Sequence, residues 1–128
     1  MIPFEDELRA LGLPAGEYVV FAGSALAAHG IREATDLDIL VSDTLFDDLL
    51  SRYPDSVDED NTDLLAIGNV ELSRRFPKTE GLIAEADIVD GYPVARLEAV
   101  MAWKRKKGRP KDIRDIGLIE AFLDRPKE

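Results

Sequence analysis

Two aspartates separated by a single residue, Asp36 and Asp38, are the side chains in this chain best suited to chemistry. They open the apolar run 37–41, whose composition predicts a β-strand. Because side chains alternate between the faces of a strand, we expect both carboxylates on one face and the apolar side chains on the other, in the core. Two like charges on one strand face repel each other, and a divalent cation relieves that repulsion. Hard oxygen ligands of this kind favour Mg²⁺.

Gly23 and Ser24 precede the acidic pair and suggest a second kind of chemistry. They lie between the predicted strand 18–22 and the helix-compatible segment 25–29. Glycine lets a phosphate approach the backbone, the start of a helix offers free N–H groups, and a serine hydroxyl adds a donor. Serine before a helix is also a common N-cap, so the phosphate interpretation depends on the nearby acidic pair.

The basic residues are concentrated near the C-terminal end, although the formal net charge is −10. The acidic balance argues against non-specific binding to nucleic acid or to an anionic membrane. A basic cluster within such a chain predicts either a local anion site or a solvated helix end. The cluster comprises Lys104, Arg105, Lys106, Lys107, Arg109 and Lys111.

Length and composition predict one domain over residues 1–128, large enough to bury a core. The chain has no cysteine, which excludes a disulfide scaffold and is compatible with a reducing, cytoplasmic location. The N-terminal residues lack the apolar core of a signal peptide. No apolar run approaches the roughly 18 residues that span a bilayer, so we expect no membrane partner.

Hydrophobic periodicity and turn residues predict a mixed α/β (α+β) fold, with a short mixed sheet and helices packed on it. We expect loops at 55–63 and 78–81. Helices are predicted over 4–11, 25–29, 45–53, 96–106 and 112–123, and strands over 18–22, 37–41, 64–67, 70–74, 84–89 and 92–94.

Two motifs together resemble a known family. The first, Gly23-Ser24 followed by Arg32, Thr35 and Asp36-Leu-Asp38, closely resembles the nucleotidyltransferase fold of the DNA polymerase β superfamily, above all its small stand-alone bacterial members. The second lies in the stretch 97–116, which is similar to a segment of those proteins and of AbiEii-like toxins. Its matching residues are Lys104, Arg109, Pro110, Lys111, Asp112 and Asp115. The resemblance covers roughly residues 18–123.

The resemblance implies a metal-dependent transfer of an NMP from an NTP to a hydroxyl acceptor, with release of pyrophosphate. Gly23 and Ser24 are then expected to hold phosphates, and Asp36 and Asp38 to hold two Mg²⁺ ions. The basic segment is expected to reach the triphosphate oxygens, through Lys104, Arg109 or Lys111.

The family also uses a third carboxylate on a later strand, and two positions fit that role. Glu71 lies between apolar neighbours on the predicted strand 70–74, and Asp87 has a similar setting on 84–89. We prefer Glu71, because its strand is the next one after the acidic loop. Either residue could instead be an ordinary surface side chain.

The acceptor stays open at this point: a small molecule, a protein or an RNA end. The short chain suggests a compact acceptor, a homo-oligomer or a partner protein. The alternative is a catalytically weak nucleotide-binding regulator, or one half of a toxin–antitoxin-type pair. Among the remaining residues we expect Asp112 as an N-cap, Asp115 paired with a lysine, His29 in a structural role, and Trp103 and Phe122 in the core.

Overall fold

A computed structural model describes residues 2–125 of the protein. Its strands form one mixed sheet in the order β3-β4-β2-β1-β6-β5. The central strand β2 runs antiparallel to β1 and parallel to β4, and β1 runs parallel to β6. The bounds are β1 (Tyr18–Phe21), β2 (Leu37–Val41), β3 (Leu64–Ile67), β4 (Val70–Ser73), β5 (Asp87–Val89) and β6 (Tyr92–Val94). The α/β fold class predicted from the sequence is confirmed.

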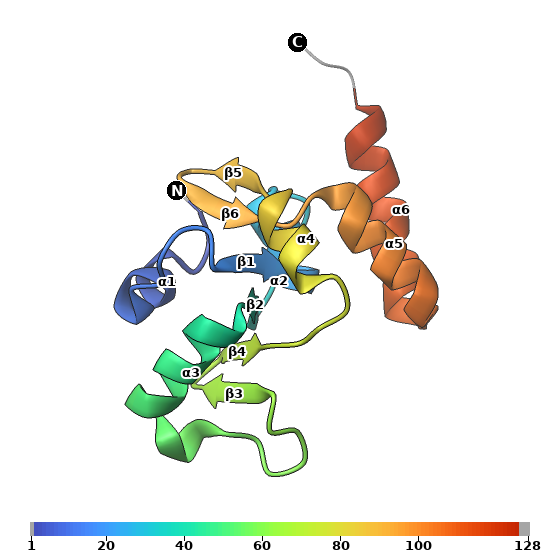
Figure 1. Ribbon diagram of the computed structural model, residues 1–128. Coiled ribbons are helices and arrows are strands. Elements are labelled where there is room, and N and C mark those ends of the chain that lie inside the picture. The colour runs from blue at the N-terminus through green and yellow to red at the C-terminus, as the bar shows by residue number, and fades with distance from the viewer. Residues whose placement is uncertain (1, 126–128) are drawn as a thin grey trace.

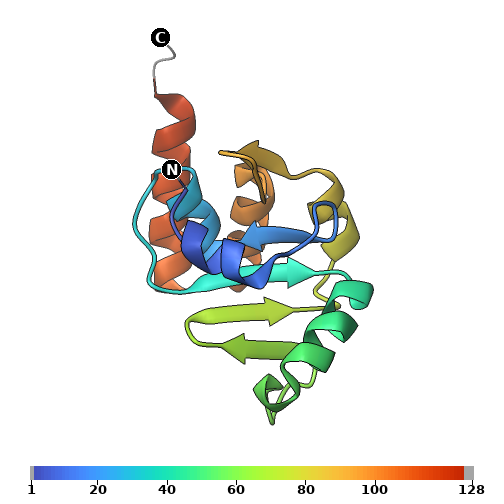
Figure 2. The ribbon, with the colours of Figure 1, turned by 90° about the vertical axis from the view of Figure 1, so that its left-hand side faces the viewer.

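Helices cover both sides of this sheet. Figure 1 shows α1 and α3 on one side and α4, α5 and α6 on the other, and Figure 2 shows the same layers from the side of α1. The bounds are α1 (Glu5–Leu11), α2 (Ala22–Ala28), α3 (Asp43–Arg52), the 3₁₀ turn η1 (Pro54–Ser56), α4 (Thr79–Ala84), α5 (Leu97–Lys107) and α6 (Pro110–Asp124). Within residues 2–125, no helix is both long enough and apolar enough to cross a membrane.

The central strand β2 is where the core and the site meet. Its bounds match the predicted strand, and Leu37, Ile39 and Val41 are almost fully buried, as the alternation predicted. Chain reversal after β2 is stabilised by Ser42, whose hydroxyl caps α3 by accepting a hydrogen bond from the amide of Leu45 at 3.1 Å. The core therefore holds β2 rigidly from one face and leaves Asp38 on the other.

The sequence-based prediction was wrong between β4 and β5. Residues 78–81 were expected to form a loop and 84–89 a strand, but α4 occupies Thr79–Ala84 and β5 begins only at Asp87. The helix starts after Lys78, which has a φ of 64°, and the Thr79 hydroxyl donates to the carbonyl of Phe76. So short a helix has little stability of its own. Packing of Leu82 and Ile83 against the core stabilises it, which local propensity does not reveal.

Two helix starts also differ from prediction. Helix α2 begins at Ala22, directly after β1, so Gly23 and Ser24 lie in its first turn and not in a turn before it. Helix α6 begins at Pro110, because a proline fits the first position of a helix, where its missing N–H is not needed.

Candidate functional site

Asp38 and Glu71 lie beside each other on neighbouring parallel strands. Asp38 of β2 is in register with Glu71 of β4. Asp38 is half-buried and Glu71 is exposed. The sequence analysis preferred Glu71 for this place but left Asp87 open, because the pairing depends on the register between strands that α3, η1 and β3 separate in the chain.

The pKa of the Asp38 carboxyl is shifted by its burial and by these neighbouring charges. Burial raises the pKa of the Asp38 carboxyl to about 6, with further contributions from the charges of Glu71 and Asp36, while Lys104 acts in the opposite direction. The three carboxylates therefore share one electrostatic site. Among residues 2–125, however, no group of three acidic, histidine or cysteine side chains lies close enough together to hold a metal ion.

Asp36 lies just outside the strand. Strand β2 begins at Leu37, and Asp36 belongs to the exposed bend before it. The regular alternation of β2 therefore covers Asp38 but begins one residue after Asp36. Both residues nevertheless line the same cavity, so the bend achieves what alternation was expected to achieve.

That cavity has a volume of about 600 Å³ and lies between the start of α2, the bend before β2, and the two C-terminal helices. Asp36 and Asp38 lie on the β2 side, and most of the basic residues lie on α5 and α6, although Arg32 precedes β2 and Asp115 lies on α6. Its polar and aromatic lining consists of Arg32, Thr35, Asp36, Asp38, Trp103, Lys104, Arg109, Lys111, Arg114 and Asp115.

Ser24 does not face this cavity. It is fully buried, and its hydroxyl donates to the carbonyl of Phe21 at 2.6 Å and accepts from the amide of Asp38 at 3.0 Å. Since its single donor is used within the fold, the hydroxyl fixes the end of β1 against the start of β2. The phosphate contact predicted for this side chain has no free donor here.

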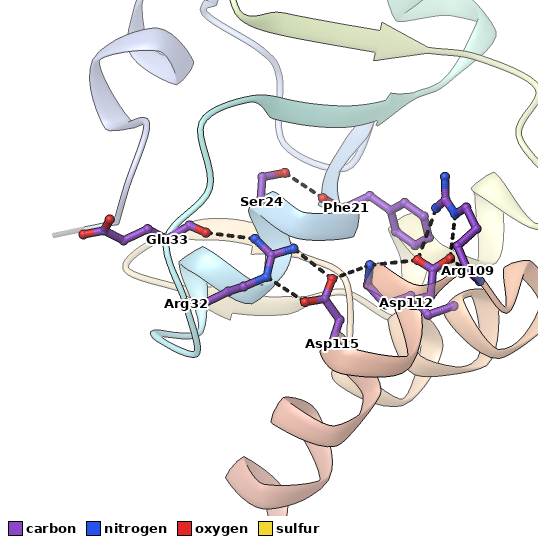
Figure 3. A network of polar contacts seen from close by, with 8 residues as sticks. Phe21, Ser24, Arg32, Glu33, Arg109, Asp112 and Asp115 are labelled. Carbon is purple, nitrogen blue, oxygen red and sulfur yellow. Dashed lines mark hydrogen bonds and ion pairs between the residues drawn. The ribbon is translucent and has the colours of Figure 1, made fainter.

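Gly23 does line the cavity, and its lack of a side chain has a specific reason. A Cβ at this position would lie 2.9 Å from Nη2 of Arg32. The Arg32 guanidinium is held there by Asp115 on α6, through bonds of 2.8 Å from Nε and 2.9 Å from Nη2 (Figure 3). Glycine at this position thus allows the close approach of Arg32. From the sequence, Gly23 was instead expected to allow the approach of a phosphate.

Lys104 is buried between two aspartates of α6. Its Nζ lies 2.9 Å from Asp115 and 3.5 Å from Asp112, and its side chain is 4% exposed. The predicted pairing of Asp115 with a lysine is confirmed. Burial raises the pKa of Asp115, but hydrogen bonds from Arg32 and Lys104 outweigh it and the net pKa is lowered.

Asp112 was predicted as the N-cap of the last helix, and that assignment was wrong by three residues. The N-cap is Arg109, and Asp112 sits at the third helical position, where it accepts a hydrogen bond from the Arg109 amide at 3.2 Å. Arg109 also binds the Asp112 carboxylate through Nε at 2.6 Å, and this contact lowers the pKa of Asp112 to about 2.

The structure adds two residues that the sequence reading missed as cavity residues. Arg114 lines the cavity one helical turn after Lys111, a spacing that helical periodicity could have revealed. Trp103 was expected in the core; it is half-buried and packs against the core, with its ring edge-on to Phe21 at a centroid distance of 5.2 Å, and it also lines the cavity.

The other acidic candidate and the histidine lie away from the carboxylates. Asp87 is exposed on the edge strand β5, which β6 and β1 separate from β2. His29 contacts the carbonyl of Ala95 at 3.4 Å, as expected for a structural residue. Of the two candidates for the third carboxylate, Glu71 is therefore the one beside Asp38.

In comparisons with known proteins, neither a family model nor a curated protein matches the chain. The function proposed below is therefore argued from the geometry of the site.

Proposed function

We propose that this protein is a magnesium-dependent nucleotidyltransferase that transfers an NMP from an NTP to a hydroxyl acceptor. One observation carries the proposal: Asp38, which is in register with Glu71, lines a cavity that α5 and α6 line with several cations. Its volume of about 600 Å³ is within the usual range for small-molecule sites. Carboxylates for a metal and cations for phosphates are the two requirements of phosphoryl chemistry.

The donor chemistry of the acidic residues suits a hard divalent cation. Asp36, Asp38 and Glu71 offer carboxylate oxygens, and the raised pKa of Asp38 shows that burial and the neighbouring negative charges disfavour its ionised form in the protein alone. Under this proposal these three residues hold two Mg²⁺ ions, which supply charge neutralisation at the α-phosphate and the leaving pyrophosphate.

The chemistry assigns a task to each wall. An acceptor oxygen forms a bond to the α-phosphorus, the bond from that phosphorus to the bridging oxygen breaks, and pyrophosphate leaves with the electron pair. Glu71, which is exposed and in register with Asp38, accepts the acceptor's proton. The basic wall binds the triphosphate and orients it for in-line attack.

The test has two stages. The thermal midpoint of the protein is measured with ATP, GTP, CTP and UTP, each with and without Mg²⁺, and pyrophosphate release is then measured with the NTP that stabilises most. We expect Mg²⁺-dependent stabilisation and release. Stabilisation without release would favour the nucleotide-binding regulator or the toxin–antitoxin-type partner, and no shift with any NTP would contradict nucleotide binding altogether.

A matched pair of variants identifies the third carboxylate. Glu71→Gln should lower pyrophosphate release by about 100-fold or more, as expected for loss of a proton acceptor, while NTP-dependent stabilisation persists. Asp87→Asn makes the same chemical change on the edge strand and should leave release unchanged. Equal effects of the two changes would contradict the role given to Glu71.

A further inference from the structure

The basic residues that line the cavity differ in whether their donors are already used. All of them carry charge, but a phosphate can bind only donors that the fold leaves open or gives up cheaply. The residues are Arg32, Lys104, Arg109, Lys111 and Arg114.

Arg32 and Lys104 are committed to the protein. Arg32 donates through Nε and Nη2 to Asp115 and through Nη1 to the carbonyl of Glu33. Lys104 is held between Asp112 and Asp115, with almost no exposed surface. A ligand that took either cation would remove one of the two cations that pair with the buried Asp115 carboxylate, which is unfavourable. These two cations are thus in place before any ligand arrives.

Arg109 has only part of its hydrogen-bond donors in use. Two of its nitrogens, Nε and Nη2, bind Asp112 at 2.6 and 3.2 Å, while the side chain is 43% exposed. Its remaining nitrogen can meet a ligand without breaking this pair, because a guanidinium carries donors on more than one edge.

Lys111 and Arg114 are the open cations. Both are exposed and line the cavity from α6, and among residues 2–125 neither has a carboxylate within ion-pairing distance. They are three positions apart on one helix, where like charges lie close enough to repel each other. An anion placed between them removes that repulsion. The acidic wall formed by Asp36 and Asp38 repels an unaccompanied anion toward this same side of the cavity.

We propose that Lys111 and Arg114 are the pair that binds the triphosphate, while Arg32 and Lys104 remain ion-paired with Asp115. The inference rests on the proposed function and adds Arg114 to its binding residues. It also changes the expected role of Lys104, from a direct phosphate ligand to a buried cation near Asp38.

The experiment uses inorganic tripolyphosphate without Mg²⁺ as the probe, so that neither base nor metal contributes. Trp103 is the chain's only tryptophan and lines the same cavity, so its fluorescence reports binding, and calorimetry gives the dissociation constant independently. We expect Lys111→Gln and Arg114→Gln each to weaken binding about tenfold, as for a hydrogen bond to a charged group. Both changes are at exposed positions, and circular dichroism with thermal melting checks that the variants stay folded.

Arg105→Gln is the matched control. Arg105 is exposed on α5 and carries the same charge, but it does not line the cavity. It should weaken tripolyphosphate binding less than twofold, and that small effect should vanish at high salt. If Arg114→Gln weakens binding no more than Arg105→Gln, the pair is not a binding site and the inference fails.

The outcomes separate this inference from the proposed function. Binding of tripolyphosphate that depends on Arg114, together with no pyrophosphate release from any NTP, leaves the anion site standing and overturns the transferase. Release that Arg114→Gln leaves unaltered, with an unaltered dissociation constant for the probe, overturns the anion site alone. A wild-type protein that does not bind the probe by calorimetry contradicts the inference directly.

Discussion

The Ser24 side chain holds the backbone of Asp38 in place. Its hydroxyl accepts a hydrogen bond from the Asp38 amide at 3.0 Å while donating to the carbonyl of Phe21 at the end of β1. Phe21 and Asp38 are also directly paired across the two antiparallel strands. Hydrogen bonds therefore link the Gly23-Ser24 motif to the Asp36-Leu-Asp38 motif, and Ser24 contributes to the site by fixing the backbone of Asp38.

Ser24→Ala should lower the free energy of unfolding by about 1–3 kcal/mol, because it removes a fully buried hydroxyl and leaves the part-buried Asp38 amide without its acceptor. Tripolyphosphate affinity should change little in the folded protein. Urea denaturation and calorimetry measure the two quantities. Ser51→Ala is the control, since the Ser51 hydroxyl bonds the Asp47 carbonyl on the exposed surface of α3. Unchanged stability with lost probe affinity would instead assign the hydroxyl to phosphate binding.

Gly23→Ala should push the Arg32 guanidinium away from its position over α2, because the added Cβ would lie 2.9 Å from Nη2. We expect a loss of about 1–2 kcal/mol, in the range of overpacked sites, measured by urea denaturation. Gly117→Ala, in the exposed interior of α6 with no atom near its Cβ, should instead stabilise by up to about 1 kcal/mol.

A double-mutant cycle isolates the cause of the Gly23 effect. In an Arg32→Ala background the clash is absent. Gly23→Ala should then not lower the free energy of unfolding, and it should stabilise slightly through helix propensity, as Gly117→Ala does. If the cost of Gly23→Ala persists without Arg32, the close approach of the guanidinium is not what requires glycine.

Asp38→Asn should stabilise the protein at neutral pH in the absence of metal. Burial raises the pKa of Asp38 from the ordinary 3.8 to about 6 in the folded state, so folding favours the protonated form. The stability of the wild type therefore falls as the pH rises from about 4 to about 6 and stays lower above it. After allowance for solvent screening we expect a difference of about 1–2 kcal/mol.

The measurement is urea denaturation of both proteins at pH 4.5 and pH 7 in the presence of a chelator. The asparagine variant should lose the fall in stability over this window and be the more stable protein at pH 7. A variant that is less stable than the wild type at pH 7 would show that the charged Asp38 is not disfavoured by its surroundings.

Asp115→Asn should be strongly destabilising, by about 3–5 kcal/mol, because it removes the carboxylate that pairs with both Arg32 and Lys104. Asp48→Asn is the matched control: its pair with Arg52 is exposed, so its loss should change stability by less than about 1 kcal/mol. Urea denaturation at pH 7 compares the two.

Acid titration gives a second measure of the same network. The pKa of Asp112 is lowered to about 2 and that of Asp115 is also lowered, so their stabilisation is complete above the ordinary value of 3.8 and is lost as the pH falls toward about 2. The wild type should therefore lose stability in this window, and Asp115→Asn should lose less of it. An equal acid dependence in the two proteins would contradict the assignment.

Local signals predicted the elements that depend on local chemistry. Strand β2 was recognised from its apolar run, and strands β3, β4 and β6 from periodicity and turn residues. The hairpins β3–β4 and β5–β6 turn at Gly68-Asn69 and Asp90-Gly91. In these turns Gly68, Asp90 and Gly91 adopt positive φ values, which their residue types permit. Helix α4 was missed because its stability comes from packing. Helical spacing indicated that Trp103 packs against the core, but it could not reveal that Trp103 also lines the cavity.

For the candidate site, too, some features follow from local sequence and others only from the tertiary structure. The sequence by itself determined the β2 strand, its core face, and the residue types that suit metal and phosphate, because these depend on neighbours in the chain. Only the tertiary structure decided that Glu71 lies beside Asp38, that Ser24 faces the backbone, and that Arg32 binds Asp115 across 83 positions. Strand register and helix packing bring such pairs together, and they are set by burial of the whole core, which no short stretch of sequence contains.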